Sequence, residues 1–127
     1  MIRKILFALS FLVMISFGIS NVLAAPVIIE FELEIELKDN TKFDMEYEVR
    51  GDMFEAEYQV PGSPTLYGED AKSMIDALLK QLELTPDMNK KDVKKKILTT
   101  FDIDNSNVDE FELEVRFSDG KRLKINN

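Results

Sequence analysis

Apolar and acidic residues alternate strictly along residues 30–37. A period of two is typical of a β-strand that buries one face. The apolar positions are Phe31, Leu33, Ile35 and Leu37, and the acidic positions are Glu30, Glu32, Glu34 and Glu36. The alternation returns over residues 43–49 and 54–60. This pattern predicts three consecutive antiparallel strands, which the cluster Pro61-Gly62-Ser63-Pro64 brings to an end.

The first strand has a second copy near the end of the chain, where residues 110–117 repeat the pattern Glu-Phe-Glu-Leu-Glu. Each copy runs into a turn dipeptide, Asp39-Asn40 or Asp119-Gly120, and then into another alternating stretch. The sequence therefore predicts two copies of one β-hairpin. Asn40 and Gly120 are suited to the left-handed position of a three-residue loop.

Such a loop fixes which residues face each other across the hairpin. It places Ile35 opposite Phe43 and Leu33 opposite Met45, and apolar residues again meet in the second hairpin. On the outward face it sets three like-charged pairs against each other: Glu30 with Glu48, Glu32 with Glu46, and Glu34 with Asp44. Like charges directly across a strand pair are destabilising. We therefore interpret these six residues as an acidic interaction face that needs a compensating strand, cation or basic partner.

Two helices are expected between the hairpins. An apolar stripe at helical spacing begins at Ala71, and Pro86 is expected to stop this helix. A second stripe runs from Val93 to Phe101 behind a capping residue, Asn89. The element order is β-β-β-α-α-β-β. The predicted fold is α+β, an antiparallel sheet of two repeated hairpins with a helical pair on one face. Tyr47, Tyr58, Phe43 and Phe54 are expected to face the helices as core residues.

The first residues are typical of a secretory signal peptide. Arg3 and Lys4 precede an apolar run over residues 5–19, and Val22-Leu23-Ala24 provides small residues for cleavage after Ala24. We expect residues 1–24 to be removed and residues 25–127 to form a single domain, with an uncleaved signal anchor as the alternative. Because the chain has no cysteine, we do not expect a lipid anchor.

Charge narrows the choice of partners. The segment 1–24 holds two of the 16 basic residues and none of the 24 acidic ones, so the mature chain carries a net charge of −10. This balance argues against a nucleic-acid partner, whose phosphates require a basic surface. It also argues against adsorption to anionic lipid after the signal is cleaved.

The doubled Phe-Glu-Leu-Glu strands, the two turn dipeptides and the link Leu84-Thr85-Pro86-Asp87-Met88 resemble the YusW-like family of small exported bacterial proteins. The resemblance covers essentially residues 25–127. It implies a secreted or cell-envelope location in Gram-positive bacteria, and it brings no biochemical activity with it. Many members are lipoproteins, whereas this chain lacks the lipid-acceptor cysteine.

Candidate chemistry is limited by what the chain lacks. Without histidine or cysteine there are no histidine-based triads, thiol nucleophiles or ordinary zinc sites. Hydrolysis by a pair of carboxylates is the third-ranked alternative. Asp102, Asp104 and Ser106 supply oxygens at positions 1, 3 and 5 of an EF-hand-like calcium loop, but position 12 is Leu113 instead of glutamate. The other interpretation of this loop is a polar connector between a helix and a strand.

A basic helix face is predicted beside this loop, made by Lys90, Lys91, Lys94, Lys95 and Lys96. It is either a solvated surface or a contact for an anionic polymer or for the acidic sheet of another copy. The sequence as a whole favours a non-enzymatic interaction module of the bacterial envelope or medium, with no cofactor and with an unidentified protein or envelope component as partner. The alternative is an envelope protein whose structure depends on calcium.

Overall fold

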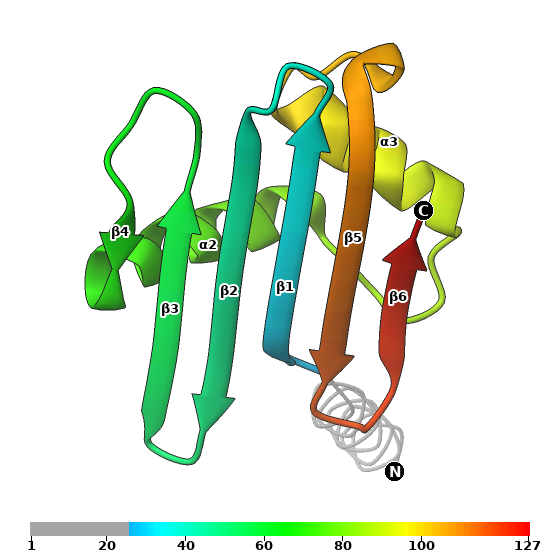
Figure 1. Ribbon diagram of the computed structural model, residues 1–127. Helices are drawn as coiled ribbons and strands as arrows, with labels where there is room; N and C mark the ends of the chain where they lie inside the picture. Colours follow the sequence, from blue (N-terminus) through cyan, green and yellow to red (C-terminus); the bar gives the residue numbers. More distant parts are fainter. Residues whose placement is uncertain (1–25) are drawn as a thin grey trace, which may run out of the picture.

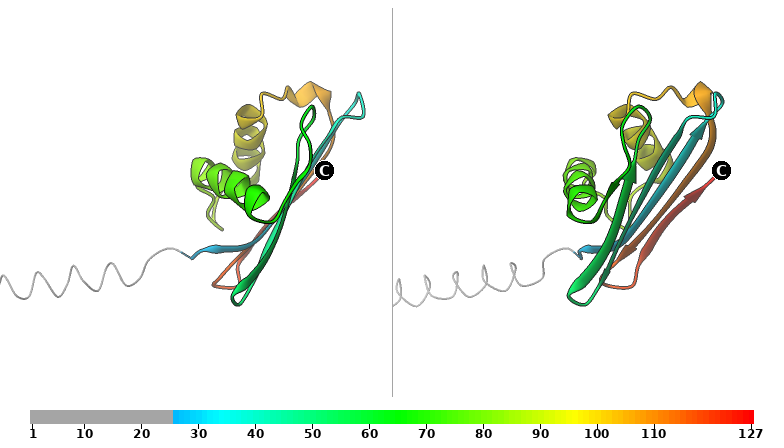
Figure 2. Two further views of the ribbon diagram at one scale, coloured as in Figure 1. Left: turned by 90° about the vertical axis from the view of Figure 1, so that its left-hand side faces the viewer. Right: turned by 60° about the vertical axis from the view of Figure 1, so that its left-hand side comes forward.

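The computed structural model describes residues 26–127, which form one antiparallel sheet with two helices packed on a single side (Figures 1 and 2). The strand order in the sheet is β4-β3-β2-β1-β5-β6. The strands are β1 (Ile28–Leu37), β2 (Lys42–Arg50), β3 (Met53–Gln59), β4 (Leu66–Tyr67), β5 (Val108–Phe117) and β6 (Arg122–Asn126). The helices are α2 (Gly68–Leu82), α3 (Lys90–Thr100) and the short 3-10 helix η1 (Asn105–Asn107). The predicted signal peptide lies outside the described residues.

Both hairpins have the register that the sequence predicts. In β1 and β2, Leu33 lies opposite Met45 and Ile35 opposite Phe43. The loops place Asn40 at φ 70° and Gly120 at φ 87°, both in the left-handed region. In that region an L side chain is strained, so glycine and asparagine are the residues best suited to these positions.

The hairpins join through β1 and β5, which pair antiparallel in the middle of the sheet. Leu33 lies opposite Leu113 there, with Phe31 opposite Val115 and Ile35 opposite Phe111. All the side chains of these three pairs are buried. The sequence did not predict which strands would be neighbours across this junction, because long-range pairing is not encoded in local alternation.

The helices begin and end for identifiable reasons. Asn89 accepts hydrogen bonds from the backbone N–H groups of Lys91 and Asp92, at 2.9 and 3.3 Å, and this confirms it as the cap of α3. Helix α2 ends at Leu82, where Glu83 turns left-handed, so it stops ahead of Pro86 and not at it. The Nζ of Lys96 donates to the carbonyl of Leu82 at 2.7 Å, which satisfies a carbonyl at the C-terminus of α2.

The core lies between the sheet and the helices. Both helices cover the face that carries Phe31, Leu33 and Ile35, as predicted. Tyr47 and Tyr58 are buried there, and Phe43 and Phe54 are half-buried against the same cluster. The short strand β4 is absent from the sequence prediction, since two residues give no readable period. Neither helix within residues 26–127 is long and apolar enough to cross a membrane.

Candidate functional site: an acidic sheet face

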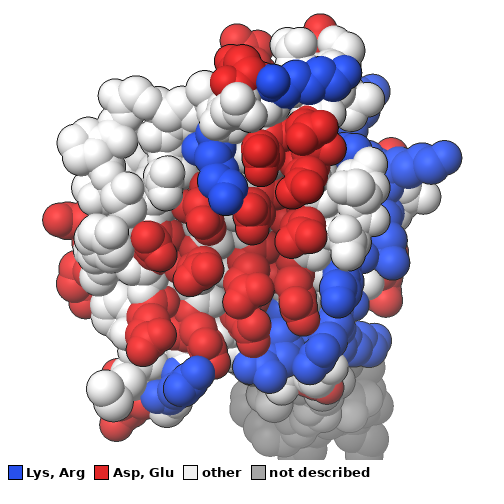
Figure 3. All heavy atoms as spheres, viewed as in Figure 1, with Lys and Arg blue, Asp and Glu red and all other residues white. Residues whose placement is uncertain are grey.

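The sheet face turned away from the helices is covered with carboxylates (Figure 3). Strict alternation places them there, because the apolar neighbours of each one point into the core. Within residues 26–127 no helix lies on this side of the sheet (Figure 2). We call the following set the acidic face: Glu30, Glu32, Glu34, Glu36, Asp44, Glu46, Glu48, Glu55, Glu57, Glu110, Glu112 and Glu114.

The acidic face is organised in rows that cross the strands. The central row runs from Glu57 through Glu46 and Glu32 to Glu114, so four strands each contribute one carboxylate. Neighbouring strands lie about 4.8 Å apart, and like charges at that spacing oppose folding. Only at β6 does the row reach a cation, where Lys124 lies opposite Glu114.

The six interaction residues predicted from sequence all belong to this face, in the predicted pairs. The prediction did not include the carboxylates of β3 and β5, although their alternation was visible. The missing information was the adjacency of β1 and β5, which brings Glu112 and Glu114 beside Glu34 and Glu32. Strand β5 thus adds further like charges beside the carboxylates of β1.

Ion pairs relieve the acidic face mainly at its margins. Arg116 on β5 approaches Glu30 with 2.9 Å between Nη2 and Oε2, and both side chains are largely shielded from solvent. Lys42 lies opposite Glu36 in the register, but its Nζ is 3.1 Å from Oε1 of Glu34 on the diagonal. Lys42 therefore forms its ion pair with the carboxylate diagonally across the strands and not with the one directly opposite.

Two further arginines lie at the border of the face. Arg50 Nε is 2.9 Å from Glu48 Oε1, and Arg122 Nη1 is 3.7 Å from Glu114 Oε1. Within residues 26–127, neither Glu32 nor Glu46 has an ion-pair partner within 4.0 Å. The centre of the acidic face therefore keeps its repulsion.

The pKa values of the central carboxylates reflect this environment. Partial desolvation raises the pKa of Glu32, and the charges of Glu30, Glu114 and Glu46 raise it further. At a low local dielectric the charged form loses hydration and meets like charges, so the protonated form is favoured.

The pKa values of carboxylates on the neighbouring strand β2 shift in both directions. Desolvation first, and then the nearby carboxylates, raise the pKa values of Asp44 and Glu46. A hydrogen bond from Arg50 lowers the pKa of Glu48 instead. Repulsion therefore acts on the carboxylates at the centre of the face, whereas Glu48 at its margin is stabilised in its charged form by Arg50.

Shallow hollows lie between the rows of carboxylates. One, of about 220 Å³, is bordered by Glu32, Asp44 and Glu112. A second, of about 250 Å³, is bordered by Glu46, Glu57 and the ring of Tyr67, which is 66% exposed. An exposed aromatic ring beside carboxylates suits a lysine or arginine side chain, which gains a cation–π contact as well as ion pairs.

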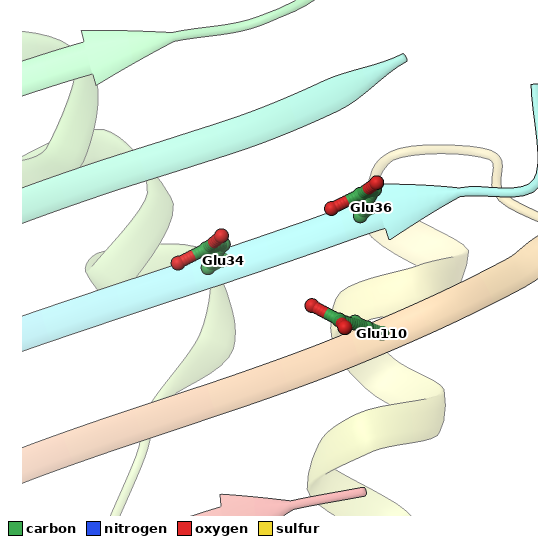
Figure 4. Close-up of side chains that lie close together, drawn as sticks. All are labelled: Glu34, Glu36 and Glu110. Atoms are coloured by element: carbon green, nitrogen blue, oxygen red, sulfur yellow. The ribbon is translucent and has the colours of Figure 1, made fainter. Parts of the chain in front are cut away.

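One corner of the acidic face has the composition of a cation site. Oxygen atoms of Glu34, Glu36 and Glu110 all lie within 4.8 Å of one another (Figure 4). Glu34 and Glu36 project from β1 and Glu110 from β5, so side chains of two neighbouring strands approach one another. Carboxylate oxygens are the ligands that calcium and magnesium prefer.

The calcium loop predicted from sequence adopts the geometry of a connector. Oδ1 of Asp104 accepts hydrogen bonds from the N–H and the hydroxyl of Ser106, at 3.0 and 2.9 Å, and these bonds lower the pKa of Asp104. Asp102 adopts a left-handed conformation with φ 55° just after α3. These contacts give all three residues a structural role, and metal binding by them stays a prediction.

The comparisons with known proteins identify the family. A family model described as YusW-like protein matches residues 29–119. The match covers most of the chain and includes every residue of the acidic face, so the chain belongs to the YusW-like family. Neither the curated proteins nor the solved structures give a significant match.

Proposed function

We propose that this protein is a non-enzymatic interaction module whose acidic face docks a basic partner. The observation that carries the proposal is the central row Glu57-Glu46-Glu32-Glu114, in which four strands align carboxylates on a surface that no described helix covers. The row opposes folding, and a partner rich in lysine or arginine would remove that opposition on binding.

The partner's chemistry follows from the shape and charge of the acidic face. The face extends over β3, β2, β1 and β5, with hollows of about 220 and 250 Å³ that are large enough for single side chains. An extended basic segment would set successive cationic side chains along a row. Exposed Tyr67 offers one of them an aromatic surface.

A titration followed by nuclear magnetic resonance tests this proposal. A short oligolysine peptide is added to the 15N-labelled domain, and the amide shifts are followed residue by residue. We expect saturable shifts along β1, β2 and β5, which weaken as salt is added. Shifts spread evenly over the helices and the sheet would contradict a defined docking face.

The setting that we propose is outside the cytoplasm. The support is the sequence of residues 1–24, with its basic start, apolar run and small residues before the cleavage point. Mass spectrometry of the secreted or surface fraction should find a mature chain that begins at Ala25. Full-length chain confined to the membrane would argue for an uncleaved anchor.

We also propose that the two hairpins are copies of one unit. Besides the repeated strand sequence, the register of β1 and β5 supports this. The residues that correspond in the two copies, Leu33 and Leu113, lie opposite each other, and the flanking pairs are arranged symmetrically about them. Two identical hairpins related by a local two-fold axis would produce this register.

A second candidate function is cation-dependent stabilisation, which the convergence of Glu34, Glu36 and Glu110 favours. Millimolar calcium would then raise the melting temperature, and Glu110→Gln would abolish the increase. Asp104→Asn is the matched variant for the connector loop. If Asp104→Asn abolishes the increase in melting temperature and Glu110→Gln does not, calcium binds at Asp102, Asp104 and Ser106 instead.

A further inference from the structure

Helix α3 and the loop after it form a groove on the helical side of the domain, with a volume of about 480 Å³. Its sides carry lysines and its floor is apolar. We call it the basic groove and define it by Lys91, Lys94, Lys95, Leu98, Ile103 and Asn105. It shares no residue with the acidic face.

The floor of the groove arises from the way α3 ends. The N–H of Ile103 donates to the carbonyl of Leu98 at 2.8 Å, and that of Asp102 to the carbonyl of Thr99 at 3.1 Å. Together with the left-handed Asp102, this is the Schellman arrangement, in which the chain folds back and an apolar contact closes the helix end. Ile103 is thereby held against Leu98 as a fixed apolar surface.

The lysines of the groove are arranged unfavourably for the isolated protein. Lys91 and Lys95 are both exposed and lie one helical turn apart, where like charges destabilise a helix. Among residues 26–127 neither has an ion-pair partner within 4.0 Å. Asp92, which follows Lys91 in the first turn of α3, does not come within 4.0 Å of either lysine.

The other charged groups around the groove are already engaged or turned aside. Lys94 donates to Oδ1 of Asn127 at 3.1 Å and lies over the ring of Phe111. The carboxylate of Asp104 is turned toward Ser106. Asn127 and Phe111 are neutral, so Lys94 still contributes positive charge to the groove. Lys91 and Lys95 are the two groove lysines that have no other side-chain partner among the described residues.

The acidic face does not cancel this charge, because the sheet separates the two surfaces (Figure 2). The ionic atmosphere screens exposed charges beyond about 8 Å at physiological salt. A sheet with a packed helix layer is at least that thick, since packed layers lie about 10 Å apart. An anion can therefore approach the basic groove in spite of the net negative charge of the protein.

We infer that the basic groove binds a phosphorylated organic molecule, with the phosphate between Lys91 and Lys95 and the apolar part on Leu98 and Ile103. Lysine ammonium groups bind phosphate as point charges, and a phosphate carries more negative charge for two such groups than a single carboxylate does. The volume lies within the range of small-molecule sites. Asn105 at the rim supplies an amide for a polar substituent.

Phenyl phosphate is the probe that tests both halves of the inference, with inorganic phosphate and benzyl alcohol as the single-part comparisons. The 15N-labelled domain is titrated with each. We expect phenyl phosphate to shift amides of α3 and of the loop through Asn105, and to bind more tightly than either comparison. Lys91→Gln with Lys95→Gln should weaken binding at least about tenfold, because two charge-assisted contacts are lost.

The matched control is Lys80→Gln with Lys121→Gln, which removes the same charge outside the groove. Equal weakening by the control pair would show that net charge alone causes the effect, and would overturn the inference. Inorganic phosphate binding as tightly as phenyl phosphate, or an absence of amide shifts in the groove, would overturn it too. Binding to vesicles of anionic phospholipid without binding of phenyl phosphate would assign the groove to a membrane headgroup. Concentration-dependent self-association relieved by the Lys91 and Lys95 variants would assign it to the acidic face of a second copy.

Discussion

Glu32 lies directly opposite Glu46 across β1 and β2, and the pKa values of both carboxyl groups are raised. Neither group has an ion-pair partner among the described residues. The two carboxylates therefore repel each other in the folded state. This relationship makes the stability of the fold sensitive to pH, to salt and to any cation that settles on the sheet.

Stability should rise as the pH falls from 7.5 to 5.5. Glu32, Asp44 and Glu46 have raised pKa values in the folded state, so the folded protein binds more protons than the unfolded chain in this range. The free energy of unfolding therefore increases as the pH falls toward the pKa values that these groups have in the unfolded chain, and it decreases as the pH rises. Melting temperature at low ionic strength measures it, and the double variant Glu32→Gln, Glu46→Gln should flatten the dependence.

Removal of one central charge should stabilise the fold at neutral pH. Glu46→Gln keeps the shape of the side chain and relieves the repulsion from Glu32 and Glu57. We expect a gain of a few tenths to about 1 kcal/mol in the free energy of unfolding by urea denaturation. Asp87→Asn, in the connector between the helices, is the matched charge change and should have almost no effect. Destabilisation by Glu46→Gln would contradict repulsion at the centre of the acidic face.

The two faces of β1 should respond oppositely to truncation. Leu33 is 1% exposed at the centre of the core, so Leu33→Ala should cost about 2–5 kcal/mol through lost burial and a cavity. Glu34→Ala removes an exposed ion pair with Lys42 and also a like charge, so its cost should be close to zero. Equal losses in the two variants would contradict the assignment of the faces.

Arg116 should contribute more to stability than Arg50, one of the two other arginines at the margin. Arg116→Gln leaves Glu30 among carboxylates with no counter-charge, and the pair it removes is the better shielded one. We expect a loss of about 0.5–1 kcal/mol. Arg50→Gln is the comparison, because its side chain is 75% exposed, and its effect should be smaller. Thermal unfolding of both variants at two salt concentrations measures the two losses of stability and shows how far each depends on salt.

Local sequence predicted the elements of this fold well, because each strand carries its own period and each hairpin its own loop chemistry. The register of Glu32 with Glu46 follows directly from the left-handed Asn40. The pairing of β1 with β5 could not be predicted in this way. It depends on how two distant strands bury Leu33 and Leu113 together, and the full width of the acidic face follows from it.

Local sequence was also insufficient for the smaller features. Strand β4 has too few residues to show a period. The basic groove needs the fold-back of Ile103 onto Leu98, which places an apolar floor beside lysines that sequence alone describes only as a charged helix face. The convergence of Glu110 on Glu34 and Glu36 likewise depends on the neighbour of β1.

The most direct test of the acidic face as a docking surface is calorimetric titration with an oligolysine peptide. The variant Glu32→Gln, Glu46→Gln, Glu114→Gln removes three of the four charges of the central row, and the control Asp70→Asn, Glu83→Gln, Asp87→Asn removes the same charge from the helical layer and its connector. We predict that the row variant weakens binding at least about tenfold and that the control changes it less than about twofold, since contacts in the row are lost only in the first. Equal weakening by the two variants would show that the peptide senses net charge alone, and would contradict the account.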